Sequence, residues 1–131
     1  MAGDNLMLLD TCALLWLSQG GGQLSAGVLQ KLAEAPFVYV SAISGFEIGI
    51  KYKKRKLELP APPSDWFNVI VKHHDLQVLP LNLEICIRST ELPPIHQDPC
   101  DRMIIASAQI LRLAVVTADS IFEAYEVETV C

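Results

Sequence analysis

The chain has 131 residues, a hydrophobic fraction of 51% and a formal net charge of −5. This length fits one domain covering residues 1–131, and the apolar content excludes a disordered or fibrous chain. No apolar run approaches the roughly 20 residues that span a bilayer, and residues 1–5 lack the basic segment of a secretion signal. We therefore expect a cytoplasmic protein that makes no membrane contact.

The first half of the chain alternates short apolar runs with segments that have helical spacing. Breaks are marked by the glycine cluster at 20–22 and by Pro36. Ser25 and Ser41 are suited to be helix N-caps, because a serine hydroxyl accepts a hydrogen bond from a free backbone amide. In chain order, the sequence predicts a strand over 6–10, a helix over 11–17, a helix over 25–35, a strand over 37–40 and a helix over 41–56.

The second half of the chain continues this alternation after a proline-rich connection at 59–63. The prolines at 93 and 94 end a helix, and Pro99 is suited to the first position of the next one. The elements predicted here are, in chain order, a helix over 64–74, a strand over 76–79, a helix over 82–91, a helix over 98–113, a strand over 114–117, a short helical turn over 120–125 and a strand over 127–130.

The predicted strands are short, continuously apolar and separated by helices. This pattern is typical of parallel sheets that helices cover on both faces, because every strand residue is then buried. The expected fold class is therefore α/β, with a central parallel sheet of about five strands flanked by helices on both faces.

Cysteine and histidine form no pattern typical of a zinc site. The four cysteines are scattered without a CxxC pair, and no histidine lies at metal-ligand spacing from them. In a cytoplasmic chain they are expected to be reduced. His73, His74 and His96 fall at predicted helix ends or in loops, and we interpret all three as ordinary surface residues, although His96 is near enough to Asp98 to touch a substrate.

Five of the ten basic residues lie in one stretch at the end of the third predicted helix. A concentrated basic patch can attract a polyanion even to an acidic protein. Cations at a helix C-terminus also complement the helix dipole, and taken alone that structural explanation is the stronger one. The basic patch consists of Lys51, Lys53, Lys54, Arg55 and Lys56.

Two aspartates lie at the carboxyl ends of predicted strands. Asp10 ends the first strand, and Asp119 lies two residues past the fourth. Parallel α/β sheets bind their ligands at this edge, so the two carboxylates converge if their strands are neighbours. The alternative role for each is a helix N-cap, but Thr11 or Ser120 could also serve as the cap.

Glu47 lies on a predicted helix, among apolar residues. It shares a face with Ile43 and Ile50, and an acid in such a stripe is costly unless something pairs with it. Lys51, four residues further on, is one partner, and a metal ion is the other. This feature alone does not decide between the two.

Asp98 and Asp101 lie close together but differ in their expected roles. Asp98 precedes Pro99, which makes it the natural N-cap of the helix, whereas Asp101 faces the protein and has only a capping box as a structural explanation. Four carboxylates gathered in one cavity repel one another unless a cation compensates. Oxygen ligands select Mg²⁺ or Mn²⁺, ions that typically act on phosphate esters.

Four segments, in order along the chain, resemble the PIN domain family and, more narrowly, the VapC-type toxins of bacterial toxin–antitoxin pairs. The resemblance implies a parallel sheet ordered 3-2-1-4-5 between helices. It also implies a homodimer that a cognate antitoxin protein neutralises. The segments that carry it are Leu8–Trp16, Val40–Lys51, Asp98–Ala106 and Val116–Asp119.

The resemblance also implies an activity and a set of site residues. The activity is endonucleolytic cleavage of RNA that leaves a 3′-hydroxyl and a 5′-phosphate. Thr11 and Thr117 match positions that support the acids, Asp98 matches a subgroup feature, and Arg102 could meet phosphate or hold a carboxylate in place. The residues that match the family's acidic quartet, and would bind Mg²⁺ or Mn²⁺, are Asp10, Glu47, Asp101 and Asp119.

The leading hypothesis is therefore a metal-dependent endoribonuclease that acts as the toxin of a toxin–antitoxin pair. A PIN-domain nuclease that processes RNA outside such a pair is the nearest alternative. A phosphoacceptor receiver domain would need paired acids after the first strand and a lysine after the last, and no lysine follows Arg102. A non-catalytic binding module would have no need of the four acids.

Overall fold

The computed structural model describes residues 6–131. Residues 1–5, which carry the expectation about a secretion signal, lie outside the described part. The strands of this part are β1 (Leu6–Leu9), β2 (Phe37–Ser41), β3 (Leu76–Leu79), β4 (Ala114–Val116) and β5 (Thr129–Val130). Its helices are α1 (Thr11–Ser18), α2 (Ala26–Glu34), α3 (Ala42–Lys53), α4 (Pro63–His73), α5 (Leu83–Glu91), α6 (Pro99–Leu111) and the 3-10 helix η2 (Ser120–Ala124).

The strands form one parallel sheet with the order β3-β2-β1-β4-β5. The predicted α/β class and strand order are confirmed. Because β1 lies between β2 and β4, the chain segments that follow β1 and β4 leave the sheet side by side. A backbone hydrogen bond joins the ends of these two strands, because the Asp10 amide donates to the Val116 carbonyl at 3.1 Å.

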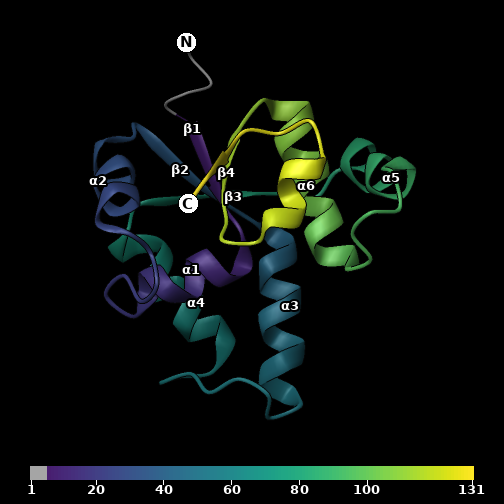
Figure 1. Ribbon diagram of the computed structural model, residues 1–131. Coiled ribbons are helices and arrows are strands. Elements are labelled where there is room, and N and C mark those ends of the chain that lie inside the picture. The colour runs from purple at the N-terminus through teal and green to yellow at the C-terminus, as the bar shows by residue number, and fades with distance from the viewer. Residues whose placement is uncertain (1–5) are drawn as a thin grey trace.

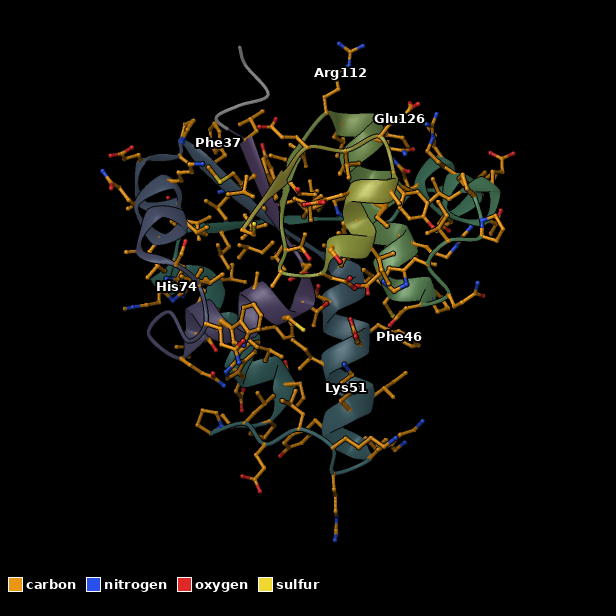
Figure 2. The ribbon with its side chains drawn as sticks, in the orientation of Figure 1. Phe37, Phe46, Lys51, His74, Arg112 and Glu126 are labelled. Carbon is orange, nitrogen blue, oxygen red and sulfur yellow. The ribbon has the colours of Figure 1, made fainter. Side chains whose placement is uncertain are left out.

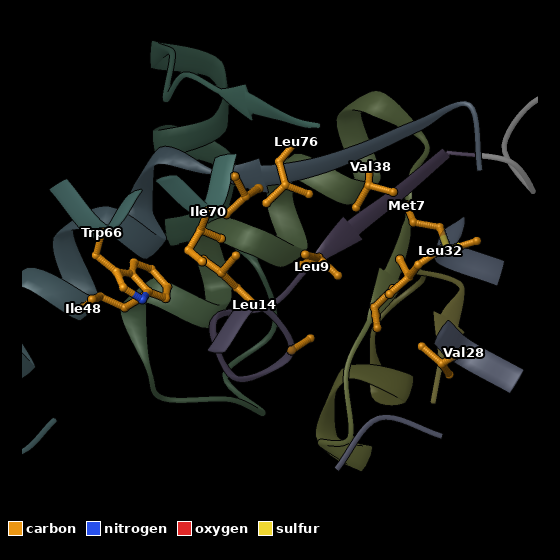
Figure 3. Packing of buried hydrophobic residues seen from close by; sticks show 13 residues of the cluster. Met7, Leu9, Leu14, Val28, Leu32, Val38, Ile48, Trp66, Ile70 and Leu76 are labelled. Atoms are coloured by element: carbon orange, nitrogen blue, oxygen red, sulfur yellow. The ribbon is translucent and has the colours of Figure 1, made fainter. Parts of the chain in front are cut away.

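Alternate residues of β1 face the two sides of the sheet, and both sides are buried. Met7 and Leu9 pack with α1, α2 and α4, and Leu8 packs with α5 and α6. Figure 1 shows these two groups of helices on opposite sides of the strands. Figure 3 shows the side with Met7 and Leu9, where Leu14 of α1 and Trp66 of α4 belong to the same core cluster. Burial on both faces explains why the strands are continuously apolar.

Serine caps and left-handed residues set the helix ends. The hydroxyls of Ser25 and Ser41 accept from Val28 and Ile43 amides, so both predicted caps are confirmed. The helix predicted to reach Lys56 ends at Lys53 instead, and Arg55 has a φ of 58°, which an α-helix cannot contain. Four of the basic-patch residues therefore surround the end of α3, which Figure 1 shows extending away from the sheet.

Glycine supplies the turn after α1. Gly22 has a φ of 50°, and a Cβ on it would lie 2.9 Å from the Trp16 side chain. Trp16 is half-buried beside this turn, whereas Trp66 is 5% exposed and belongs to the core. Within residues 6–131, no helix has the length and apolar character needed to cross a membrane.

Truncation of a central strand residue tests the two-sided core. Leu9 is fully buried, so we expect Leu9→Ala to lower the free energy of unfolding by about 3 kcal/mol through lost contacts and a residual cavity. Leu83→Ala is the matched control, because Leu83 is 75% exposed and its change should cost less than about 0.5 kcal/mol. Urea denaturation of both variants makes the comparison, and equal losses would contradict the described core.

Candidate active site

A cavity of about 360 Å³ opens at the carboxyl edge of the sheet. Its walls come from the segments after β1 and β4, from α3 and from the start of α6. Thr11, Cys12 and Lys51 also line it, and Figure 2 shows Lys51 on α3. The acids that line it are Asp10, Glu47, Asp98, Asp101 and Asp119. The sheet topology thus brings the four candidate acids and Asp98 to one place.

Asp10 is held by the end of β1 and the start of α1. It is 5% exposed, and its Oδ1 accepts the Ala13 amide at 2.7 Å as the N-cap of α1. Burial raises the pKa of the Asp10 carboxyl, while hydrogen bonds from the Thr117 side chain and the Ala13 amide oppose that rise. The cap uses Oδ1, and the Asp10 side chain lines the cavity as well.

Asp119 lies in the segment after β4, and like Asp10 it is an N-cap that also lines the cavity. Its Oδ1 accepts the Ile121 amide at 3.0 Å and caps η2, and its own amide donates to Thr117 Oγ1 at 3.0 Å. The expectation that Thr11 or Ser120 could serve as these caps is therefore wrong. Thr11 instead makes a buried hydrogen bond of 2.9 Å with the Ser44 hydroxyl, which fixes α1 against α3.

Glu47 has one partner in the protein and one oxygen without any. Oε2 accepts from Lys51 Nζ at 3.0 Å, the i,i+4 pair expected from the sequence. Oε1 is buried and has no hydrogen-bond partner among residues 6–131. An unpaired buried carboxylate oxygen is costly, so this side of Glu47 is suited to a cation.

Asp98 and Asp101 divide their roles as predicted from Pro99. Asp98 Oδ1 accepts from the Cys100 amide at 2.8 Å and from the Asp101 amide at 3.4 Å, which makes Asp98 the N-cap of α6. Asp101 caps nothing. Burial, together with the negative charge of Asp98, raises the pKa of the Asp101 carboxyl to about 7, although His96 acts in the opposite direction.

His96 is a site residue that the sequence analysis missed. Its side chain is only 11% exposed, and Nε2 lies 2.8 Å from Asp101 Oδ2 and 3.4 Å from Asp119 Oδ2. The interpretation of His96 as an ordinary surface residue is therefore wrong. Its place two residues before the helix cap Asp98 was the available signal. His96 lies in the loop that leads into α6, and Asp101 is in the first turn of that helix, so the two residues are close in the chain.

Arg102 has a structural role in the described chain. Its guanidinium donates to four backbone carbonyls at 2.7–3.0 Å, those of Ser89, Leu92, Pro93 and His96. It therefore holds the connection between α5 and α6, and among residues 6–131 its hydrogen-bond partners are carbonyls rather than a carboxylate. Among the histidines, His73 is exposed and packs edge-to-face on His74.

The donor set fits a hard divalent cation. Asp101, Asp119 and His96 offer ligand atoms that all lie within 4.8 Å of one another, and Asp10 and Glu47 line the same cavity. The buried Glu47 Oε1 lacks a partner, and the acids raise one another's pKa. A cation would relieve both, because it satisfies the free oxygen and screens the repulsion. All four cysteines are free thiols.

The model of one protein family matches almost the whole chain: the PIN domain, over residues 7–128. The chain is also similar to "Ribonuclease VapC22" of Mycobacterium tuberculosis (strain ATCC 25618 / H37Rv), with 27% identity over 103 residues, 78% of each chain.

Two solved structures share the fold at low identity. One is VapBC2 from Rickettsia felis bound to a DNA fragment from their promoter, with a TM-score of 0.71 and 14% identity over 95% of this chain and 97% of that one. The other is a toxin–antitoxin complex from Klebsiella pneumoniae, with a TM-score of 0.66 and 23% identity over 95% of this chain and 96% of that one.

The raised pKa of Asp101 predicts how the stability of the metal-free protein depends on pH. Between about 4 and about 7, folded Asp101 keeps a proton that the unfolded chain has lost. Unfolding then releases a proton, so a rise in pH lowers the free energy of unfolding, by up to about 1.4 kcal/mol per pH unit. The raised pKa of Asp10 acts in the same direction.

Asp101→Asn removes this titration and should flatten the dependence. The measurement is urea denaturation in EDTA across that pH range, with the wild-type protein and Asp101→Asn compared at each pH. Parallel curves for the two proteins would show that Asp101 titrates normally.

Proposed function

Because the chain belongs to the PIN domain family, we propose that it is a metal-dependent endoribonuclease and the toxin of a toxin–antitoxin pair. The observation that carries the proposal is the convergence of Asp10, Glu47, Asp101 and Asp119 on one cavity at the carboxyl edge of the sheet. The similarity to a protein named as a ribonuclease supports the substrate class, and the similarity to toxin–antitoxin complexes supports the biological role.

The four carboxylates would hold Mg²⁺ or Mn²⁺. A cation held there would supply charge neutralisation at the phosphate and activation of the attacking water. The protein fixes the donors in advance: the caps at Ala13 and Ile121 orient Asp10 and Asp119, and Lys51 orients Glu47. Hydrolysis breaks the bond between phosphorus and the 3′-oxygen, so the products carry a 5′-phosphate and a 3′-hydroxyl.

The basic patch is proposed to bring the RNA to the cavity. Its members are exposed and surround the end of α3, and Lys51 also lines the cavity beside Glu47. A net charge of −5 repels RNA at long range, so a local cluster of cations is needed to steer it. The patch begins on α3, the helix that also carries Glu47, so RNA bound to the patch would lie beside the cavity.

A homodimer and a cognate antitoxin are the proposed protein partners, in the cytoplasm. The exposed apolar side chains supply surface for both, notably Phe46 on α3, Val69 on α4 and Leu83 on α5. Figure 2 shows Phe46 pointing outward from α3. Phe46 directly precedes Glu47, so a partner seated there would lie at the edge of the cavity.

Asp10→Asn tests the metal-dependent mechanism with little effect on the fold. The asparagine oxygen still accepts the Ala13 amide, so the cap of α1 is kept while one ligand charge is lost. We expect RNA cleavage to fall by about 100-fold or more. EDTA should stop the wild-type enzyme, and added Mg²⁺ or Mn²⁺ should restore it.

Asp75→Asn is the matched control, because Asp75 is exposed and far along the chain from the acids, in a turn with a φ of 51° that asparagine also adopts. It should cleave as the wild type does. Full activity in Asp10→Asn, or undiminished activity in EDTA, would overturn the mechanism.

The role of the basic patch is tested by the salt dependence of RNA binding. In the Asp10→Asn background, the double change Lys53→Gln with Lys56→Gln should weaken binding. It should reduce the slope of log affinity against log salt by about 0.7 for each lost phosphate contact. The control is Lys31→Gln with Lys72→Gln, two exposed lysines outside the patch. Equal effects of the two double changes would show that the patch has no special role.

A further inference from the structure

His96 is held rigidly at its backbone. Its amide donates to the Tyr125 hydroxyl at 2.7 Å, and its carbonyl accepts from Arg102 Nη1 at 3.0 Å. The Tyr125 hydroxyl in turn donates to the Pro93 carbonyl at 2.8 Å. Tyr125 is 5% exposed, so both of these hydrogen bonds are shielded from solvent. The loop before α6 is thus pinned from two sides, at the residue that carries the imidazole.

The imidazole ring of His96 is also oriented. It lies edge-to-face on Phe122, with ring centroids 5.9 Å apart and an interplanar angle of 80°, and Phe122 is fully buried. Nδ1 accepts the Asp98 amide at 3.3 Å. A neutral imidazole that accepts at Nδ1 carries its proton on Nε2. The contacts of the ring therefore assign Nε2 as a donor.

The donor Nε2 lies between two carboxylates. It is buried and lies 2.8 Å from Asp101 Oδ2 and 3.4 Å from Asp119 Oδ2, and among residues 6–131 its N–H makes a hydrogen bond with neither oxygen. Asp101 comes from α6 and Asp119 from the segment after β4, so no local structure joins them. Two adjacent carboxylates repel, and a donor that lies between them can offset that repulsion.

We propose that His96 is a positioning residue, whose Nε2, placed between the Asp101 and Asp119 carboxylates, keeps them in the arrangement that receives the divalent cation. This inference rests on the proposed function only in taking these two acids as cation ligands. The competing role is a nitrogen ligand to the cation. That role needs an unprotonated Nε2, and the ring proton would then sit on Nδ1, against the Asp98 amide. The contacts favour the donor.

Two substitutions at His96 separate the donor from the bulk of the ring. The amide nitrogen of glutamine reaches the place of Nε2, and the amide of asparagine reaches only the place of Nδ1. We expect His96→Asn to weaken the binding of Mn²⁺ and Mg²⁺ about 10-fold or more, as the loss of an outer-shell partner typically does. We expect His96→Gln to keep the affinity of the wild type within a few-fold. Isothermal calorimetry with each ion alone measures these values without RNA.

Spectroscopy of bound Mn²⁺ gives a second readout. If His96 only positions the carboxylates, electron spin echo spectra of the wild-type protein show no nitrogen directly bound to Mn²⁺. A nitrogen coupling that is present in the wild type and lost in His96→Asn would make His96 a ligand and overturn the proposal.

Further results would also count against the positioning role. Equal Mn²⁺ affinity in all three proteins would overturn this inference alone, and so would a His96→Gln affinity as poor as that of His96→Asn. No binding to the wild-type protein would overturn the metal-dependent function together with it. Thermal unfolding checks that each variant folds.

Tyr125→Phe is the second variant, for the case in which His96→Asn does not fold. It removes the hydroxyl that pins the His96 backbone and touches none of the carboxylates. We expect it to weaken Mn²⁺ binding by a few-fold, because the imidazole then has more freedom. Unchanged Mn²⁺ affinity in a folded Tyr125→Phe would contradict the proposal.

Discussion

Repulsion among buried carboxylates is the constraint on which the site depends. Five acids line one cavity of about 360 Å³, and Lys51 is the cation that lines it with them. Burial raises the pKa of Asp10, and it raises that of Asp101 to about 7. Such an arrangement opposes folding unless each acid is held by other interactions, and the surrounding structure supplies them.

The protein holds three of these acids by giving each one a structural task that uses a single oxygen. Asp10, Asp98 and Asp119 are N-caps, of α1, α6 and η2, and each caps through Oδ1. A cap fixes the side chain through backbone amides and places the positive end of the helix dipole beside the negative charge. Capping and ion binding are therefore compatible roles. The two roles are not alternatives for these acids, although the residue pattern alone suggests that they are.

The features that could be predicted from the sequence are those that depend on residues close together in the chain. Apolar runs, serine caps and Pro99 gave the strands, the helix starts and the role of Asp98, and the family motifs gave the sheet order. His96 and Arg102 could not be placed in this way. Their roles depend on contacts across the α5–α6 connection, which have no period or spacing in the sequence. The end of α3 was predicted too late, because Arg55 adopts a left-handed conformation that its residue type does not indicate.

The position of Arg102 explains why the cavity stays negative. Arg102 follows Asp101 directly in α6, and adjacent helix residues do not face each other, so its guanidinium leaves the helix on another side. It binds instead the carbonyls of Ser89 and Leu92 at the end of α5, where a cation complements the helix dipole. The same side chain fixes the His96 carbonyl. Arg102 therefore orders the loop that carries the imidazole, and it contributes no positive charge to Asp101.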